Sequence, residues 1–385
     1  MDEKRIQEVL LEILYAAVNG EESSPSLIQK VTRVDLVALY RLAKKHDLAH
    51  IVSEFVYQNK IEIDNEEFRD RMQRENLLAV YRHERMKHAF DQICICFDDA
   101  RIAYVPLKGA VIKAYYPYEH MRMSCDIDIL IHEEDMEYAI NCLAKRGYRC
   151  EKINYHDVSL YSPNKTHLEL HFNIQENMDS LDAVLKDAWK HTRLVHGSRY
   201  EFSKEFFVFH MYAHMAYHFL SGGCGVRSLL DIWVMEHRMD AHYACAEVLL
   251  KQAGIDTFAR EMCSISNKCF SLEERDVFSD VVLKYIFRGG VYGTKDNRIA
   301  VKKGEAGNVF FYALKRLFLP YRSMVILYPV LKKIPLLLPF CWIVRCASVV
   351  IKGKSKRVAS ELAYVNGVSD DTISELAEIR ARLGL

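Results

Sequence analysis

Two aspartates separated by a single residue form the pattern in this sequence that points most directly to chemistry. Asp126 and Asp128 begin the stretch 126–131, whose other members are isoleucine and leucine. On a β-strand, residues i and i+2 point to the same face and lie roughly 6.6 Å apart. Two carboxylates on one face of a buried strand repel each other unless cations neutralise them. Because Mg²⁺ prefers oxygen ligands and is often bound by a few carboxylates plus substrate phosphates, the pattern predicts a Mg²⁺ or Mn²⁺ site.

A third carboxylate and a glycine turn extend this prediction. Glu169 lies between two leucines in a later strand candidate and would supply a third oxygen ligand. Lys108-Gly109, between a strand and a helix, would present N–H groups to phosphates. Two ions about 3.5–4 Å apart can stabilise the attacking and leaving oxygens of an in-line displacement. The alternatives are a solvated strand edge for the aspartates, a surface acid for Glu169 and an ordinary loop lysine for Lys108.

Three histidines, His210, His214 and His218, recur every four residues in an apolar stretch. A spacing of four suits zinc ligands on a helix. No glutamate accompanies them as in a zinc protease, so we favour polar residues on a core helix that faces a cleft. In that position His214 and His218 would line a nucleotide or acceptor pocket. Arg227 and Asp231, one helical turn apart, are expected to take part in an intrahelical or inter-element ion pair.

The elements that position these groups follow from hydrophobic periodicity. The first hundred residues predict helices only, the longest over 66–99, because apolar residues recur at helical spacing. A small α/β core follows, with strands over 102–107, 126–131, 158–161 and 167–172 and helices over 110–116 and 133–146. After residue 174 the pattern predicts helices again: a buried helix over 205–220, a second over 228–238 and a last one that ends at Gly384.

The 385 residues carry 52 basic and 52 acidic side chains, so the formal net charge is zero. Such a balance argues against an extended nucleic-acid-binding surface, which is usually basic. The 11 cysteines include no C-x-x-C pair and lie largely in apolar stretches, which favours free thiols and a cytoplasmic protein. The first residues do not resemble a signal peptide.

Residues 334–351 are apolar except for Arg345 and contain Pro335 and Pro339. Eighteen residues barely reach across a bilayer, and the arginine and prolines make a membrane span unfavourable. A hairpin buried against the helical domain is the favoured interpretation. Because basic residues flank the stretch on both sides, weak peripheral contact of residues 332–357 with an anionic membrane is the alternative.

Taken together, these motifs resemble the DNA polymerase beta-like nucleotidyltransferase superfamily, and more closely its bacterial branch of uncharacterised nucleotidyltransferases. The resemblance covers about residues 102–234. Its motifs are Leu107-Lys108-Gly109, Tyr116-Pro117, Arg122, Asp126-Ile127-Asp128, Glu169-Leu170-His171 and Arg227 with Asp231. One departure is Ala110, which follows the turn glycine where the superfamily usually has Ser or Gly. The segment from the turn to Asp126 is also long, so residues 116–125 are expected to form a loop over the site.

The resemblance implies an α+β protein in which a small mixed-sheet nucleotidyltransferase core, residues 101–175, is embedded between a helical segment, 1–100, and a helical domain, 176–385. It implies transfer of a nucleoside monophosphate from a nucleoside triphosphate (NTP) such as ATP to an unidentified acceptor hydroxyl, with Mg²⁺ or Mn²⁺. Asp126, Asp128 and Glu169 would be the catalytic, metal-binding residues. The nucleotide-binding residues would be Lys108, Gly109, Arg122, His171 and His214.

A second hypothesis comes from another class of protein. The chain would be a catalytically inactive binding or assembly protein that keeps the nucleotidyltransferase fold, at a membrane and linked to surface polysaccharide production. Fold resemblance alone does not decide between the two, because function resides in the site. Ala110 favours the inactive protein, whereas the intact carboxylates favour the enzyme.

Overall fold

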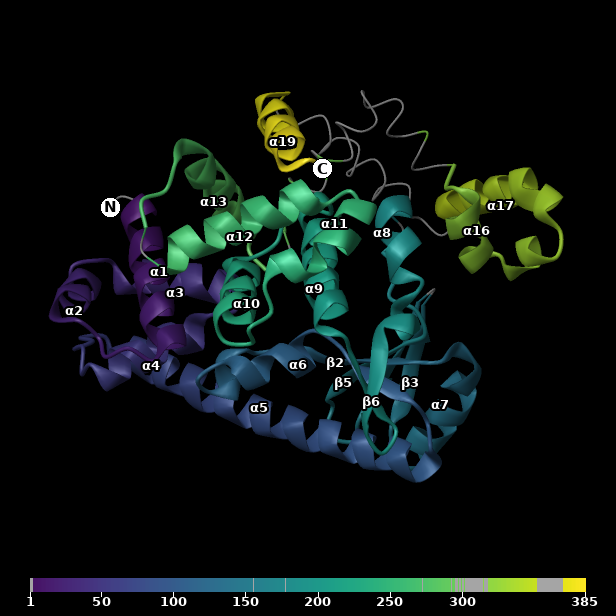
Figure 1. Cartoon of the computed structure of the whole chain (residues 1–385), viewed down its shortest axis with the longest axis horizontal. Coiled ribbons are helices and arrows are strands. Elements are labelled where there is room, and N and C mark those ends of the chain that lie inside the picture. The colour runs from purple at the N-terminus through teal and green to yellow at the C-terminus, as the bar shows by residue number, and fades with distance from the viewer. Residues whose placement is uncertain are drawn as a thin grey trace.

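The computed structural model describes residues 3–154, 156–176, 178–271, 273–291, 293–294, 297, 299, 301, 314, 318–351 and 370–385. The N-terminal helices are α1 (Glu3–Asn19), α2 (Pro25–Thr32), α3 (Leu36–Lys45), α4 (Ala49–Gln58) and α5 (Glu66–Ala100). The helix expected over 66–99 is therefore confirmed as α5, which begins where the side chain of Asn65 accepts the N–H of Phe68. Figure 1 shows α5 running along one edge of the molecule, with α1 and α10 standing above it.

The sheet and its connections fill the next hundred residues. The strands are β1 (Tyr104–Pro106), β2 (Asp126–Ile131), β3 (Arg149–Ile153), β4 (Asp157–Tyr161), β5 (His167–His171), β6 (Thr192–His196) and β7 (Arg199–Phe202). The helices between them are α6 (Gly109–Ile112), η1 (Lys113–Tyr115), η2 (Glu119–Met121), η3 (Glu133–Asp135), α7 (Met136–Lys145), α8 (Asp179–Leu185) and η4 (Ala188–His191).

Among the described residues these strands form one mixed sheet in the order β3-β4-β5-β2-β1-β7-β6. β2 pairs with β5 in parallel, and so does β1 with β7, whereas the other neighbours are antiparallel. The α+β class predicted from the sequence is confirmed, with a mixed sheet and helices at both ends.

The two faces of the central strands differ in chemistry because side chains alternate along a strand. Ile127 and Ile129 of β2 and Leu170 of β5 point to one face, where they pack with Phe97 of α5 and Leu143 of α7 in one hydrophobic cluster. The other face receives the odd-numbered residues of β5 and the even-numbered residues of β2. This alternation brings the carboxylates and histidines of these strands to a single face.

The first two of the remaining helices, α9 (Lys204–Leu220) and α10 (Val226–His237), lie over this polar face. The others are η5 (Tyr243–Ala246), α11 (Glu247–Gln252), α12 (Asp256–Phe270) and α13 (Val277–Gly289), followed by α16 (Tyr321–Leu327), η6 (Pro329–Lys332), η7 (Pro335–Leu337), α17 (Leu338–Ile351) and α19 (Asp370–Leu383). α9 is buried on nearly every side, as its apolar sequence predicts. Its side chains share one core with α1–α4 and α10–α13.

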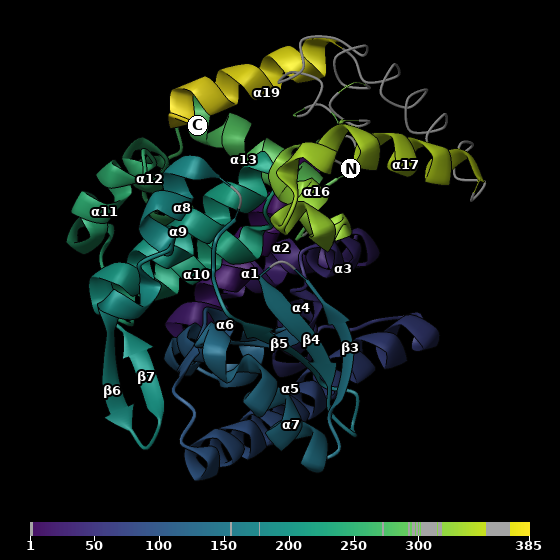
Figure 2. The ribbon, with the colours of Figure 1, turned by 90° about the vertical axis from the view of Figure 1, so that its right-hand side faces the viewer.

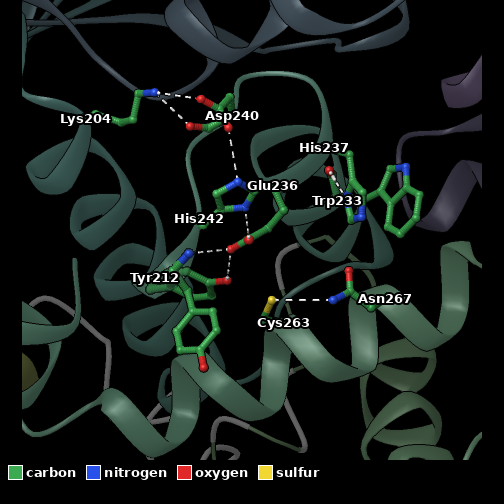
Figure 3. A network of polar contacts seen from close by, with 10 residues as sticks. Lys204, Tyr212, Trp233, Glu236, His237, Asp240, His242, Cys263 and Asn267 are labelled. Atoms are coloured by element: carbon green, nitrogen blue, oxygen red, sulfur yellow. Dashed lines mark hydrogen bonds and ion pairs between the residues drawn. The ribbon is translucent and has the colours of Figure 1, made fainter. Parts of the chain in front are cut away.

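A buried carboxylate fixes α9 against α10. Glu236, 7% exposed at the end of α10, accepts a hydrogen bond from the N–H of Tyr243 at 2.7 Å. The hydroxyl of Tyr212 donates to the same carboxylate at 3.4 Å, and His242 lies 3.1 Å from it (Figure 3). Because Tyr212 belongs to α9, this network sets the relative position of the two helices that form the upper wall of the site.

Three parts of the structure differ from the expectations. The strand β3 was not among the expected strands. Only helices were expected after residue 174, but residues 192–202 form the hairpin β6–β7 at the end of the sheet, which Figure 2 shows on the side away from β3 and β4. Its signal in the sequence is Gly197-Ser198 between two β-forming runs, a two-residue hairpin turn. Residues 334–351 do contribute to a helical hairpin, but Leu336 is 90% exposed, so the expected burial of this stretch is wrong for that residue. No described helix is long and apolar enough to cross a membrane.

Candidate active site

The sheet places the three carboxylates side by side. In the parallel pairing of β2 with β5, Asp128 lies opposite Glu169 and Asp126 lies opposite His167. Ligand atoms of Asp128, Glu169 and His171 all lie within 4.8 Å of one another, and so do those of Asp126, His167 and Glu169. Glu169 belongs to both groups, so its carboxylate lies within 4.8 Å of an oxygen of each aspartate.

The three carboxylates of this cluster repel one another when they are ionised. Burial and the neighbouring Asp128 raise the pKa of Asp126, and burial followed by Asp128 raises the pKa of Glu169. Burial also opposes ionisation of Asp128, but the charge of Lys108 and a hydrogen bond from His171 hold its pKa well below the usual range. A divalent cation would relieve this repulsion, and hard carboxylate oxygens are suitable ligands for it. The residues present therefore fit a Mg²⁺ or Mn²⁺ ion.

His171 orients one of these carboxylates. Its Nε2–H donates to Oδ1 of Asp128 at 3.1 Å, and Nε2 lies 3.6 Å from Glu169. The side chain is 7% exposed, so this contact is shielded from water. His171 was expected to bind nucleotide, but it contacts Asp128 and does not line the cleft that holds the carboxylates.

The turn between β1 and α6 stands beside the aspartates. Lys108 adopts φ 39°, uncommon for a residue with a side chain, and brings its charge close enough to affect Asp128. Gly109 has no room for a side chain, because a Cβ there would lie 2.6 Å from Oγ of Ser124. The N–H groups of Ala110 and Val111 bond to carbonyls of Leu107 and Lys108 within the turn, at 3.0 Å each. Phosphate binding by the turn would thus depend mainly on the Lys108 side chain.

Arg122 and Asp231 form a buried ion pair across the site. Nε of Arg122 lies 2.7 Å and 3.0 Å from the two carboxylate oxygens of Asp231, and the hydroxyl of Tyr116 donates to Oδ1 at 2.7 Å. Of the two expected kinds of ion pair, the structure has the inter-element kind: Arg227 reaches Asp47 at 2.6 Å and does not pair with Asp231 within the helix. Arg122 comes from the loop before β2, outside the helix α10 that carries Asp231, and its contact shields Asp231 from water. The first ion pair ties the loop before β2 to α10, and the second ties the connection between α3 and α4 to the same helix.

The histidines of α9 lie above the carboxylates. Burial and the charge of Lys108 keep the pKa of His214 well below its usual value, so the ring is neutral. Its Nδ1–H donates to Glu176 at 3.0 Å, which leaves Nε2 to accept from Nε2–H of His218, also at 3.0 Å. His210 is 1% exposed and packs edge-on against Phe202, as a core residue would. None of the groups of described side chains that could share a cation contains these histidines.

A cleft of about 300 Å³ joins these parts, a size in the range of small-molecule sites. Its floor holds the turn and the carboxylates: Lys108, Gly109, Ser124, Asp126, Asp128 and Glu169. Its upper wall comes from α9 and α10: His214, His218, Arg227, Ser228 and Asp231. Of the residues expected to bind nucleotide, only His171 does not line this cleft.

Sequence reasoning did not identify Ser124 or Glu176 as parts of this site. Ser124 stands two positions before Asp126, and its place beside Gly109 follows only from the course of the loop. Glu176 lies 38 positions from His214, so nothing in the local pattern connects them.

Comparison with protein families identifies one match, which covers residues 32–271 and is described as uncharacterised nucleotidyltransferase. No curated protein and no solved structure matches the chain. The match spans more than half of the chain and includes the sheet, the glycine turn, the three carboxylates and the histidines of α9. The chain therefore belongs to the uncharacterised nucleotidyltransferase family.

Proposed function

We propose that this chain transfers a nucleoside monophosphate from an NTP to an acceptor hydroxyl, with Mg²⁺ or Mn²⁺ bound by Asp126, Asp128 and Glu169. The observation that carries the proposal is the set of three carboxylates on one sheet face, in a cleft that Lys108 also lines. Membership of the family supports nucleotidyl transfer, and the motifs around Asp126 support the polymerase beta-like superfamily.

The chain's own residues account for the steps of this reaction. The acceptor oxygen forms a bond to the α-phosphorus while the bond between that phosphorus and the α–β bridging oxygen breaks, and pyrophosphate leaves. Glu169 takes the proton of the attacking hydroxyl, a role that suits a carboxylate whose pKa is raised by burial and by Asp128. Asp126, Asp128 and Glu169 would hold the cation, which when bound would supply positive charge to the phosphate oxygens.

Binding of the triphosphate depends on the floor and the wall of the cleft. Lys108 attracts the phosphates, and Gly109 keeps the turn narrow. Ser124 supplies a hydroxyl beside Gly109, where Ala110 itself offers none. His214 lies on the wall as a neutral group, and His171 holds Asp128 in place. Nε of Arg122 is engaged with Asp231 and Nη1 with the carbonyl of Met123, so its phosphate contact would use Nη2.

Calorimetric titration of Mg²⁺, followed by each NTP with Mg²⁺, tests the proposal. Binding should be strong to the wild type, much weaker to Asp128→Asn and unchanged for Glu134→Gln, an exposed acid just after β2. Thermal unfolding without ligand checks that each variant is folded. Equal heats for wild type and Asp128→Asn would contradict the metal site. The reaction itself is measured as pyrophosphate release with candidate acceptors.

The second candidate is a member of the family that binds a nucleotide without turning it over. The engaged amides of Ala110 and Val111 favour it, because they reduce the number of N–H groups available to phosphates. Saturable, Mg²⁺-dependent NTP binding by a chain that releases no pyrophosphate with protein, RNA, sugar or small-molecule acceptors would support this candidate over the enzyme. In both cases the eleven free cysteines are consistent with our proposal of a cytoplasmic protein.

A further inference from the structure

Residues 318–351, named here the C-terminal hairpin, have a small core of their own. Met324, Leu331 and Cys341 are buried together in a hydrophobic cluster separate from the main core. Two hydrogen bonds close the hairpin: the hydroxyl of Tyr321 donates to the carbonyl of Leu331 at 2.7 Å, and Nε1 of Trp342 donates to the carbonyl of Leu319 at 2.9 Å. In Figure 1, α16 and α17 lie together at one side of the molecule.

The outer face of the C-terminal hairpin is apolar and exposed. Leu336 is 90% exposed, Phe340 62% and Ile343 66%. Their spacing of four and three residues places them on one side of η7 and α17, while Cys341 faces the small core. Other exposed apolar side chains border them: Leu327, Val330, Ile334 and Val344. A contiguous apolar face of this kind marks an interaction surface more often than scattered single residues do.

The charge of the same region is strongly biased. Between residues 306 and 360 the sequence contains ten lysines and arginines and no aspartate or glutamate. Because the whole chain is neutral, the rest of it carries a formal net charge of −10. Lys333 is exposed in the connection between η6 and η7, next to the apolar residues. An apolar face within a segment of net positive charge is complementary to the surface of an anionic membrane.

We infer that the C-terminal hairpin docks onto anionic membrane surfaces, with Leu336, Phe340 and Ile343 inserted at the headgroup level and basic residues against the phosphates. Nucleic acid would use the positive charge but not three exposed aliphatic and aromatic side chains on one face. A second copy of the chain would bring two regions of the same charge together. The 14 residues of α17 extend about 21 Å, shorter than the ~30 Å apolar core of a bilayer, so the contact is interfacial.

Vesicle flotation with the full chain tests this inference. Vesicles of phosphatidylcholine with phosphatidylglycerol should carry the protein upward, vesicles of phosphatidylcholine alone should not, and added salt should weaken the binding. Leu336→Gln/Phe340→Gln/Ile343→Gln should abolish flotation. At ~1 kcal/mol per basic residue and 1.4 kcal/mol per tenfold, Lys332→Gln/Lys333→Gln should weaken binding about 25-fold.

A matched control replaces three residues of similar exposure elsewhere, Leu77→Gln/Tyr81→Gln/Val277→Gln, and should float like the wild type. Thermal unfolding of all variants shows whether the main body remains folded. The inference is overturned if the wild type does not float, or if the control triple loses flotation equally. Flotation that survives alkaline carbonate would mean integral insertion. Self-association abolished by the hairpin triple, without vesicle binding, would identify a second copy as the occupant.

Discussion

Arg122 and Asp231 lie 109 positions apart in the chain, yet Nε of the arginine is 2.7 Å from Oδ1 of the aspartate. Their side chains are only 10% and 6% exposed. The pair connects the loop that leads into the metal-binding strand with the helix that forms the upper wall of the cleft. It is therefore the contact on which the shape of the cleft should depend most.

Removal of one partner leaves the other charge buried and uncompensated. We expect Asp231→Ala to lower the free energy of unfolding by about 3–5 kcal/mol, measured by urea denaturation. Asp47→Ala removes the partner of Arg227 in a more exposed pair and should cost less, within about 1 kcal/mol. The double variant Arg122→Met/Asp231→Leu should recover much of the loss. Equal destabilisation by Asp231→Ala and Asp47→Ala would contradict the buried character of the first pair.

His171 should control the affinity for the cation through the orientation of Asp128. Its hydrogen bond to Asp128 orients that carboxylate and keeps it ionised. We expect His171→Ala to weaken Mg²⁺ binding about 10–100-fold in calorimetry, the usual effect of losing a partner that orients a ligand. His196→Ala, on the exposed strand β6, serves as the control. Unchanged Mg²⁺ affinity in His171→Ala would show that His171 does not orient Asp128 for cation binding.

Gly109 should tolerate alanine only when Ser124 is also changed. A Cβ at position 109 would lie 2.6 Å from Oγ of Ser124, closer than real side chains approach. Gly109→Ala should therefore cost about 1–3 kcal/mol of stability through overpacking, and Gly109→Ala/Ser124→Gly should regain most of it. Ser124→Gly alone should instead weaken NTP binding. Additive losses in the double variant would show that the two residues do not meet.

His46 should make the protein sensitive to acid. It is fully buried, its Nε2–H donates to the carbonyl of Phe287 at 3.3 Å, and its Nδ1 accepts the N–H of Val226 at 3.2 Å. Burial lowers its pKa from 6.5 to about 4. The unfolded chain thus binds this proton more readily, and stability is lost as the pH falls from about 6.5 to about 4, by about 3 kcal/mol in total.

Comparison with His46→Gln isolates this contribution from other titrating groups. Glutamine can donate to Phe287 and accept from Val226 but takes up no proton. As the pH falls from 7 to 4, the wild type should therefore lose more unfolding free energy than His46→Gln does. A difference that does not depend on pH would show that His46 is not the titrating group.

The cysteines should all react as thiols. Each of the eleven is unbridged in the structure. Thiol titration of the denatured, unreduced protein should return eleven groups per chain. A markedly smaller number would indicate disulfides and an oxidising compartment, and would argue against the cytoplasm.

The central sheet was predictable because its signal is local. The alternation in residues 126–131 and the turn before His167 indicate the strands, and the side-chain period of two then puts Asp126 and Asp128 on one face. The pairing of β5 with β2 adds Glu169 to that face. Helices α5 and α9 were predictable from length and apolar character in the same way.

Contacts between distant segments were not predictable by these means. The sequence favours Arg227 as the partner of Asp231 because they are one helical turn apart, but the tertiary fold brings in Arg122. His214 meets Glu176 for the same kind of reason. The hairpin β6–β7 is short and partly exposed, so its sequence has a weaker hydrophobic pattern than the apolar helices that follow it. Burial of residues 334–351 was expected from their hydrophobicity alone. Hydrophobicity does not show whether another part of the chain packs against an apolar segment.

The parallel register of β2 and β5 has a consequence for how this protein matures. Asp128 faces Glu169, and a slip of one position would place a leucine there instead. The two strands are separated along the chain by α7 and two further strands, so their alignment forms only when distant segments meet, a slow kind of event in folding. An ion that needs both carboxylates would then bind only chains whose strands are aligned correctly. Cation uptake during refolding would report that alignment directly, before any acceptor is known.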